Sequence, residues 1–392
     1  MMRKVVITHA KRTPVGSFGG SLASFTAAQL GSIAIKAVLD ESGINPAAID
    51  EVIMGNVLMA GQGQAPARQA ALFSGLPESV EALTINKMCG SGLKAIMLAQ
   101  QAIALGDADV IIAGGMESMS NAPYLLPKGR NGYRYGHGEV LDSVLLDGLT
   151  DVYNKIHMGS CADKCAKDMS FSREELDAFA IESYTRAQNA QKEGRFDSEM
   201  IPVTLKTKAG ETVINKDEDP EKTNFAKIPT LRPVFEKDGV VTAANASNLN
   251  DGAAAVLVMS EEKARELGFT PMVEIVAQSS AAKAPIDFTT APADAILKVL
   301  KKAGLTVKDI DLYEINEAFA VVSLAVNKLT GITPENTNVN GGAIAIGHPI
   351  GASGARIMAT LLHEMQRRGS TYGLASLCIG GGEASALIVK KY

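Results

Sequence analysis

Apolar residues along the chain occur both in short continuous runs and in longer stretches with helical spacing. Continuous runs, typical of strands that are buried on both faces, lie at Lys4–Thr8, Glu51–Leu58, Ala108–Ala113, Val273–Ala277, Leu312–Ile315 and Tyr372–Leu377. Helical spacing predicts helices over Phe25–Ser42, from the residues after Cys89 to Gly106, over Ala293–Ala303, from Glu317 onwards and over Ala355–Met365. This alternation predicts a largely parallel sheet that helices cover on both faces.

The pattern changes between about residues 117 and 250, where prolines and charges are frequent and long apolar runs are few. One helix is clear there, because Ser172 and Glu175 form a predicted capping box and Gly194 ends the apolar stripe. We expect an inserted, loop-rich domain, which commonly supplies substrate-binding surface. The predicted domains are an N-terminal half over 1–118, a loop domain over 119–250 and a C-terminal half over 251–392, with a short strand around 251–260 that completes the N-terminal half.

The second half of the chain repeats the first. Asn86–Gln101 places Cys89 in a glycine-rich turn directly before a predicted helix. Val339–Asn340 and the glycine-rich turn through His348 have the same order of strand, turn and helix. Cys378 follows a strand, as a glycine pair follows the corresponding strand of the first half. The chain is therefore expected to form two related α/β halves with reactive turns in corresponding places.

Cys89 is the first candidate for chemistry. Because the unpaired N–H groups at a helix N-terminus favour negative charge, we expect the thiol there to have a lowered pKa. Gly90 and Gly92 are expected to leave room for a substrate carbonyl. The alternative is a buried structural cysteine.

Composition limits the function classes. Of 392 residues, 46% are apolar and 21% charged, which is typical of a globular protein of two or three compact units. The net charge of -5 argues against binding nucleic acid through phosphate contacts. Four cysteines without paired spacing indicate free thiols in a reducing compartment. With no apolar run long enough for a bilayer and no signal or transit peptide in the sequence, we expect a cytoplasmic protein with no membrane partner.

Cys89, His348 and Cys378 all lie in glycine-rich turns at predicted strand ends or helix starts, where α/β sheets usually form their sites. A thiolate nucleophile, a histidine that takes its proton and a second thiol for another proton transfer form a coherent set. Backbone N–H groups in such turns are suited to hold the oxyanion of a thioester carbonyl.

Six segments, taken together and in order, resemble the thiolase family over the whole chain. They are Asn86–Gly92, Gly114–Ser120, His157–Gly159, Asn316–Phe319, Asn340–Arg356 and Cys378–Gly382. The resemblance implies a thiolase fold of two duplicated βαβαβ-type halves, with mixed sheets in a layered α-β-α-β-α arrangement and an inserted loop domain. It also implies a reversible reaction in which two acetyl-CoA molecules give acetoacetyl-CoA and CoA.

The resemblance further implies a role for each matching position. Cys89 matches the nucleophile that becomes acylated, and His348 matches the residue that activates its thiol. Cys378 matches the acid/base that exchanges a proton with the acetyl methyl group. Asn316 matches the side chain that holds a water molecule beside the enolate oxygen. The backbone N–H groups of Cys89 and Gly380 match a second oxyanion hole.

The inserted region resembles the family's loop domain, which binds coenzyme A as a substrate, and no prosthetic group is implied. Matching channel positions are Leu149, His157, Met158, Tyr184, Phe235, Ala243, Ser247, Phe288, Ala318 and Phe319, with Lys222, Thr223, Asn224 and Lys227 nearer the nucleotide. The two lysines could instead form a solvated basic face. Arg130–Gly136 corresponds to the loop through which related enzymes form homotetramers; otherwise it is an exposed basic loop.

Phe288 and Tyr184 resemble a subgroup, the mitochondrial-type acetoacetyl-CoA thiolases, which also accept 2-methylacetoacetyl-CoA. The resemblance implies a potassium ion held by Tyr184 and by main-chain oxygens of Ala243, Ala244, Ala246 and Ile344. The alternative for Tyr184 is a ring packed in the core. A zinc ion on His157, Cys161 and Cys165, which are spaced by four residues, lacks a fourth ligand nearby.

Three other functions stay open. A ketoacyl synthase shares the duplicated fold and the cysteine nucleophile but pairs it with two histidines or with His and Asn, whereas this chain has Cys378. A degradative 3-ketoacyl-CoA thiolase would differ only in accepting longer chains. A non-catalytic acyl-CoA-binding module would need none of the four matching reactive residues.

Overall fold

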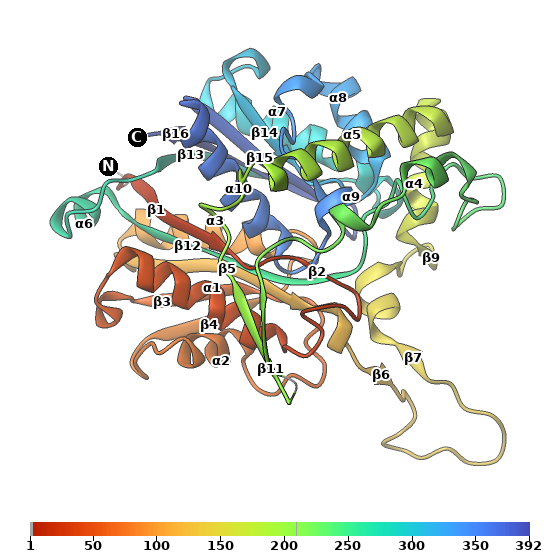
Figure 1. Ribbon diagram of the computed structural model, residues 1–392, viewed down its shortest axis with the longest axis horizontal. Coiled ribbons are helices and arrows are strands. Elements are labelled where there is room, and N and C mark those ends of the chain that lie inside the picture. Colours follow the sequence, from red (N-terminus) through yellow and green to blue (C-terminus); the bar gives the residue numbers. More distant parts are fainter. Residues whose placement is uncertain (1–2, 209) are drawn as a thin grey trace.

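The structure is a computed structural model that describes residues 3–208 and 210–392. The strands of its main sheet are β1 (Val5–Arg12), β2 (Gly16–Ser17), β3 (Glu51–Gly55), β4 (Glu81–Ile85), β5 (Val110–Ser118), β12 (Asn250–Ser260), β13 (Val273–Ala282), β14 (Leu312–Ile315), β15 (Tyr372–Ile379) and β16 (Glu383–Lys391). Within the described residues these ten strands run in the order β14-β15-β16-β13-β1-β12-β5-β3-β4, and β2 pairs with β12 (Figure 1).

The sheet is mixed, which confirms what the family resemblance implies, whereas the largely parallel sheet predicted from the apolar pattern alone is wrong. Parallel pairing is confined to β3 with β4 and β5, and to β14 with β15. The central strands β1, β12, β13 and β16 all pair antiparallel. A continuous apolar run shows that a strand is buried on both faces but does not show its direction. Direction is set here by pairing with strands far away in the chain, such as that of β12 with β1 and β5.

Helices cover both halves of the sheet on the outside, and two further helices lie between the halves. The helices are α1 (Ala27–Ser42), α2 (Pro66–Phe73), α3 (Ser91–Leu105), α4 (Met158–Met169), α5 (Arg173–Lys192), α6 (Glu261–Glu266), α7 (Ala291–Ala303), α8 (Ala320–Thr330), α9 (Ala343–Ile346) and α10 (Ser353–Arg368). α1 and α2 pack outside the β12-β5-β3-β4 half, and α7 packs outside β13-β16-β15 with α8 against it. α3 and α10 pack against each other between the halves, which gives the α-β-α-β-α layers (Figure 1).

Each layer has its own apolar core. Side chains of α3 and α10, such as Ile96 and Met358, share the central core with strand residues of both halves. α1 and α2 cover a second core, and a third joins α7 and α8 to α4 and α5 of the inserted region. Because the central core is made by the two helices that follow the Cys89 and His348 turns, it fixes these turns relative to each other.

Several predicted boundaries of helices and strands agree with the structure, and two predictions differ from it. α5 begins at the predicted capping box, since Ser172 Oγ accepts from the Glu175 N–H and the Glu175 carboxylate accepts from the Ser172 N–H. The helix expected from Glu317 begins three residues later, at Ala320, because the intervening residues turn through the site. Val339–Asn340, expected as a strand, forms a turn whose neighbour Asn338 has φ 47°.

The inserted region contains short strand pairs that the sequence did not reveal. They are β6 (Tyr124–Leu125) with β7 (Leu141–Asp142), β8 (Thr150–Asp151) with β9 (Ile156–His157), and β10 (Val203–Thr207) with β11 (Gly210–Ile214). The β6–β7 connection projects away from the layers (Figure 1). Over residues 3–208 and 210–392, no helix is long and apolar enough to span a membrane.

Candidate functional site

A cavity of about 310 Å³ opens where the N-termini of α3 and α10 meet the inserted region. Cys89, His348 and Gly380 line it, although they come from three distant parts of the chain. The predicted channel residues that line it are Leu149, His157, Met158, Phe235, Ala243, Ser247, Phe288, Ala318 and Phe319. The structure therefore gathers one reactive turn from each half, together with most of the predicted channel, around one hollow.

Local hydrogen bonds hold Cys89 in a tight turn directly before α3. The Asn86 Oδ1 accepts from the Met88 N–H at 2.9 Å, and the Ser91 Oγ accepts from the Lys87 N–H at 2.8 Å. Ser91 Oγ also donates to the Met88 carbonyl at 2.6 Å. Met88 has φ 48°, a left-handed conformation that a side chain rarely adopts, so the turn is under backbone strain. This strain is compatible with a turn that is shaped for function.

The glycines around this turn make room for protein rather than for substrate, so that expectation is wrong. A Cβ on Gly92 would lie 2.7 Å from the Ala355 nitrogen in α10, and a Cβ on Gly354 would collide with the backbone of Leu93 in α3. The two helices thus cross backbone to backbone at Gly92 and Gly354. A Cβ on Gly90 would collide with the Ile379 side chain. The repeated glycine motif is a packing motif that brings the two turns together.

His348 is held at both its backbone and its ring. Its N–H donates to the Asn250 Oδ1 at 2.9 Å. Its Nδ1 lies 2.6 Å from the Ser353 Oγ, which in turn donates to the Pro349 carbonyl at 2.9 Å. Because the single hydroxyl proton of Ser353 is used by Pro349, we assign the Nδ1 proton to His348. The assignment leaves Nε2 unprotonated.

The His348 Nε2 is buried and has no hydrogen-bond partner among the described residues. A free lone pair beside the cavity is what a general base requires. Burial, followed by the positive charge of Arg356, lowers the pKa of His348 to about 3. The ring is therefore neutral at physiological pH and ready to accept a proton.

The thiol of Cys89 does not have the lowered pKa expected at a helix start. Burial raises the pKa of Cys89 to about 11, and a hydrogen bond from the Gly380 N–H only partly opposes this rise. Burial also raises the pKa of Cys378 well above its ordinary value, and Cys89 adds to that rise. The resting site thus contains two thiols and a neutral imidazole.

Glu117 links the loop after β3 to the loop after His348, a role that sequence reasoning missed. Its carboxylate accepts from the N–H groups of Val57, Leu58 and Gly351 at 3.0, 3.2 and 2.9 Å. It also accepts from the Asn56 Nδ2 at 2.6 Å. Burial raises the pKa of Glu117 to about 7, although these donors favour its charged form. A carboxylate thus fixes the loop that follows His348 to the first half of the chain.

Aromatic rings form one wall of the cavity. The Phe319 ring meets both Phe235 and Phe288 edge to face, with 6.3 Å between ring centroids in each pair. His157 stacks on Phe235 at 4.5 Å. The His157 Nδ1 also accepts from the Gly159 N–H at 2.9 Å, so His157 caps α4. Such rings suit an apolar, rather rigid ligand segment.

The predicted nucleotide-side residues separate into two groups. Lys222 and Thr223 line a second, open hollow that shares Asn248 and Leu249 with the first, so the two hollows are adjacent. Asn224 and Lys227 line neither hollow. Asn224 instead caps a short 3-10 helix through its Oδ1, and Lys227 lies within that helix.

Tyr184 packs in the core between α5 and the inserted region, with 4% of its surface exposed. Its hydroxyl is hydrogen-bonded to Thr223 and Asn248, and burial raises the pKa of Tyr184. No described backbone N–H donates to the carbonyl oxygens of Ala243, Ala244 or Ala246. Free carbonyl oxygens and a phenol are the hard oxygen ligands that suit an alkali cation, so these residues fit the proposed ion.

The zinc hypothesis has no support in the structure. In residues 3–208 and 210–392, no three His, Cys, Asp or Glu side chains are placed to hold a metal ion. Cys161 and Cys165 instead belong to the apolar core under α4, where burial raises the pKa of both thiols.

Asn250 and Ser353 are further residues of the site that sequence reasoning did not single out, although Ser353 lies within the motif Asn340–Arg356. Ser353 lies five residues after His348, a spacing that places it in the first turn of α10. Asn250 comes from β12, so only the strand pairing brings it under His348. The spacing of Ser353 could have indicated its role, whereas nothing local could have indicated that of Asn250.

Comparison with known proteins adds a second line of evidence. Residues 5–262 match the family model "Thiolase, N-terminal domain", and residues 269–391 match "Thiolase, C-terminal domain". The chain is 52% identical to an acetyl-CoA acetyltransferase of Cupriavidus necator, with both chains covered completely. It is also 52% identical to the mitochondrial acetyl-CoA acetyltransferase of Danio rerio, over 100% of this chain and 93% of that one. The crystal structure of Acat5 thiolase from Ascaris suum in complex with coenzyme A superimposes with a TM-score of 0.94, at 44% identity and 100% coverage of both chains.

Proposed function

The chain belongs to the thiolase family, and we propose that it acts as an acetyl-CoA acetyltransferase with Cys89 as the acylated nucleophile. The observation that carries this proposal is the free Nε2 of His348 beside Cys89 in one cavity. The reaction is a reversible condensation of two acetyl-CoA molecules to acetoacetyl-CoA and CoA. It proceeds through an acyl-enzyme, which divides a difficult carbon–carbon step into two easier ones.

In the first step, the Cys89 sulfur attacks the thioester carbonyl as its proton moves to the His348 Nε2. Because the pKa values of about 11 and about 3 disfavour a resting thiolate–imidazolium pair, proton transfer accompanies the attack. The carbonyl oxygen becomes an oxyanion that the N–H groups of Cys89 and Gly380 are placed to bind. The CoA sulfur then leaves with the proton, and acetyl-Cys89 remains.

In the second step, Cys378 first passes its proton to the His348 Nε2, and the resulting thiolate takes a proton from the methyl group of a second acetyl-CoA. The carbanion formed in this way attacks acetyl-Cys89. Negative charge develops on the thioester oxygen of the incoming molecule. We assign its stabilisation to His348 and to a water molecule held by Asn316, and the side chains of these two residues lie 3.4 Å apart. The carbon–carbon bond forms as the Cys89 sulfur leaves and takes back the proton from the His348 Nε2.

A mass spectrum of the protein after incubation with acetoacetyl-CoA tests the proposal. An acetyl adduct on Cys89 is expected in the native chain and absent in C89A. C161A, which removes a buried thiol outside the cavity, is the matched control and should keep the adduct. No adduct and no CoA-dependent cleavage would leave only a binding module.

Chain length is the first finer point of the proposal. Phe288 is 2% exposed and closes the cavity beside Phe319, which favours short acyl chains, including the branched 2-methylacetoacetyl group. A broader 3-ketoacyl-CoA thiolase is the alternative. Thiolysis rates across acetoacetyl-, 2-methylacetoacetyl- and longer 3-ketoacyl-CoA separate the two, since a broad enzyme would not lose activity with length.

The second finer point of the proposal is a potassium ion beside Tyr184. It would order the segment around Ala243, which lines the cavity, and so act on substrate binding. Replacing potassium with sodium should raise KM for acetoacetyl-CoA, and Y184F should remove this difference. Identical rates in both salts would exclude the ion.

The third finer point concerns the oligomeric state of the protein and its location in the cell. We propose a homotetramer formed through the segment between β6 and β7, which contains Arg130–Gly136 and exposes large side chains such as Tyr135. Light scattering should give four chains, and deletion of the loop tip should give a smaller species. We further propose a cytoplasmic location, which cell fractionation tests.

A further inference from the structure

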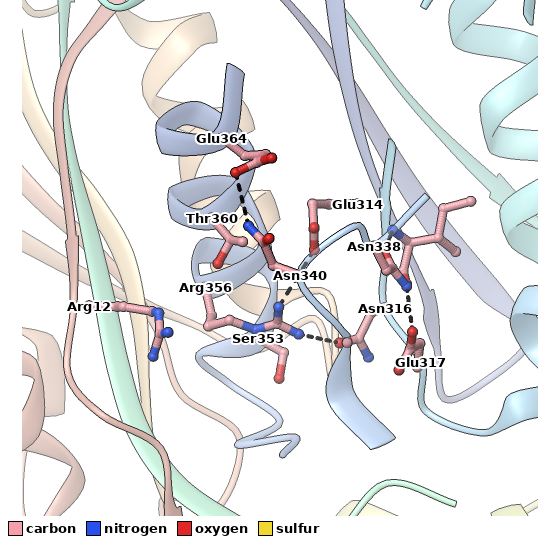
Figure 2. Close-up of polar contacts among 12 residues, drawn as sticks. Arg12, Glu314, Asn316, Glu317, Asn338, Asn340, Ser353, Arg356, Thr360 and Glu364 are labelled. Atoms are coloured by element: carbon pink, nitrogen blue, oxygen red, sulfur yellow. Dashed lines mark hydrogen bonds and ion pairs between the residues drawn. The ribbon is translucent and has the colours of Figure 1, made fainter. Parts of the chain in front are cut away.

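A buried arginine lies directly behind the catalytic turn of the second half. Arg356, in α10, is 2% exposed, and its Nη2 donates to the Asn316 Oδ1 at 3.5 Å. Its Nη1 is 3.6 Å from the Oε2 of Glu314 in β14. Figure 2 shows the guanidinium between these two side chains. Arg356 Nε and Nη1 and Glu314 Oε2 have no hydrogen-bond partner among the described residues.

A second buried arginine shows how unusual this arrangement is. Arg12 in β1 is also fully buried, but its Nε donates to Glu199 at 2.5 Å and its two terminal nitrogens bind Asp217 at 2.7 and 2.9 Å. Such a pair of hydrogen-bonded carboxylates offsets the cost of taking a charge out of water. Arg356 has one long hydrogen bond and one loose ion pair. Stability alone therefore accounts for Arg12 but not for Arg356.

The position of Arg356 explains what it can do. An asparagine amide presents an acceptor and a donor that are alike in shape, so its orientation depends on its neighbours. Arg356 Nη2 is the only described side-chain donor to the Asn316 Oδ1. Because the guanidinium of Arg356 can only donate, the Asn316 Oδ1 must face Arg356. The Asn316 Nδ2 then faces His348 and lies 3.4 Å from its Nδ1. Since the His348 Nδ1 carries a proton and donates it to the Ser353 Oγ, Nδ1 does not accept from Asn316, and the Nδ2 protons remain free for another acceptor.

Glu314 in turn restrains the guanidinium. Burial raises the pKa of Glu314 well above its ordinary value, while the Arg356 charge opposes this rise. The carboxyl group faces Nη1, on the other side of the fork from Asn316. The cation also favours negative charge that develops at the enolate oxygen, because buried charges interact strongly.

We propose that Arg356 is a positioning residue for enolate formation: its guanidinium, restrained by Glu314, turns the Asn316 Nδ2 towards His348, so that Asn316 can hold the water molecule beside the enolate oxygen. This inference rests on the function proposed above, in which Asn316 serves the second step. The first step uses the N–H groups of Cys89 and Gly380 instead. Loss of Arg356 should therefore slow one half-reaction and leave the other.

Two exchange assays separate the half-reactions. Acyl transfer to Cys89 is followed by the exchange of labelled CoA into acetyl-CoA, and enolate formation by deuterium uptake into the acetyl methyl group in D₂O. R356K keeps the charge but cannot present a planar fork to both Asn316 and Glu314. We expect R356K to slow methyl deuteration about 30-fold, as misplacement of one oxyanion donor does, while CoA exchange changes less than about twofold.

R12K is the matched control, because it changes the other buried arginine without touching Asn316. It should lower the melting temperature and leave the ratio of the two exchange rates unchanged. In the double variant R356K/N316A, methyl deuteration should be no slower than in N316A alone, since Arg356 acts through Asn316.

Three outcomes would overturn the inference: equal slowing of both exchanges in R356K, a changed ratio in R12K, or additive losses in the double variant. The first two would assign to Arg356 a general structural role, and the third a role independent of Asn316. Failure of the proposed function is recognised separately, because the native chain would then form no acetyl adduct on Cys89.

Discussion

Replacement of Ser353 by alanine should change the tautomer of His348. In the native chain the Ser353 Oγ accepts a hydrogen bond from the His348 Nδ1–H at 2.6 Å and donates its own hydrogen bond to the Pro349 carbonyl at 2.9 Å. Among the described residues, the other hydrogen-bond contact of Nδ1 is with the Asn316 Nδ2 at 3.4 Å, which is a donor. An Nδ1–H facing a donor is unfavourable, so the proton should move to Nε2, where it blocks the general base.

The magnitude follows from the lost hydrogen bond. His348 is 5% exposed, so water cannot replace Ser353, and an unmet buried donor costs about 1–3 kcal/mol. If about 1.5 kcal/mol separates the tautomers in the variant, kcat falls about tenfold, because each 1.4 kcal/mol is a factor of ten. KM should change little, since Ser353 does not line the cavity.

The assay combines steady-state kinetics with nitrogen NMR of the protein labelled in its five histidines. The His348 signals, assigned by comparison with H348N, should show protonated Nδ1 in the native chain and protonated Nε2 in S353A. Ser323 provides a matched control, because it is equally buried and its Oγ has no partner among the described residues. S323A should leave kcat and the spectrum unchanged. An unchanged kcat in S353A, or a native spectrum that already shows protonated Nε2, would refute the reasoning.

Three further predictions concern the same site. Cys89, with a pKa of about 11, and His348, with a pKa of about 3, do not titrate between about pH 5 and about pH 9, whereas Glu117 titrates at about 7. In E117Q the rate of Cys89 acylation by acetyl-CoA should therefore be flat over this range, and a limb between about pH 6 and 8 in that variant would indicate a thiolate–imidazolium pair. G354A should lower the free energy of unfolding by about 1–3 kcal/mol in denaturant titrations, because its Cβ meets the Leu93 backbone; an unchanged midpoint would show that the two helices part easily. F288M should reduce the preference for 2-methylacetoacetyl-CoA over acetoacetyl-CoA about tenfold in kcat/KM, and an unchanged ratio would dismiss the role of Phe288.

What the sequence could predict is what depends on neighbouring residues. The capping box of Ser172 and Glu175, the start of α3 after Cys89 and the apolar run of β15 all follow from local pattern, and the structure has them. Strand direction depends instead on pairing partners far away in the chain. β16 was missed as well, because Glu383–Lys391 begins and ends with polar residues.

The site shows the same division. Reactive residue types in glycine-rich turns indicated Cys89, His348 and Cys378, because chemistry requires those types. Their supports did not stand out, because Glu117, Asn250 and Arg356 act through partners 40 to 234 residues away. Such residues are ordinary polar residues in sequence and become informative only once their burial and partners are known.

At Cys89, the local effect of the helix N-terminus and the tertiary effect of burial change the pKa of the thiol in opposite directions, and the two effects can be compared in size. A helix N-terminus stabilises a nearby negative charge by about 0.3–1 kcal/mol, and by about 2 kcal/mol in favourable partly buried sites. The rise of the Cys89 pKa from 9.0 to about 11 corresponds to a net cost of about 3 kcal/mol for forming the thiolate. Burial in the apolar cavity therefore outweighs the helix and the Gly380 N–H together. The same cavity holds the base neutral, so the site forms its nucleophile only when a thioester is present to receive it.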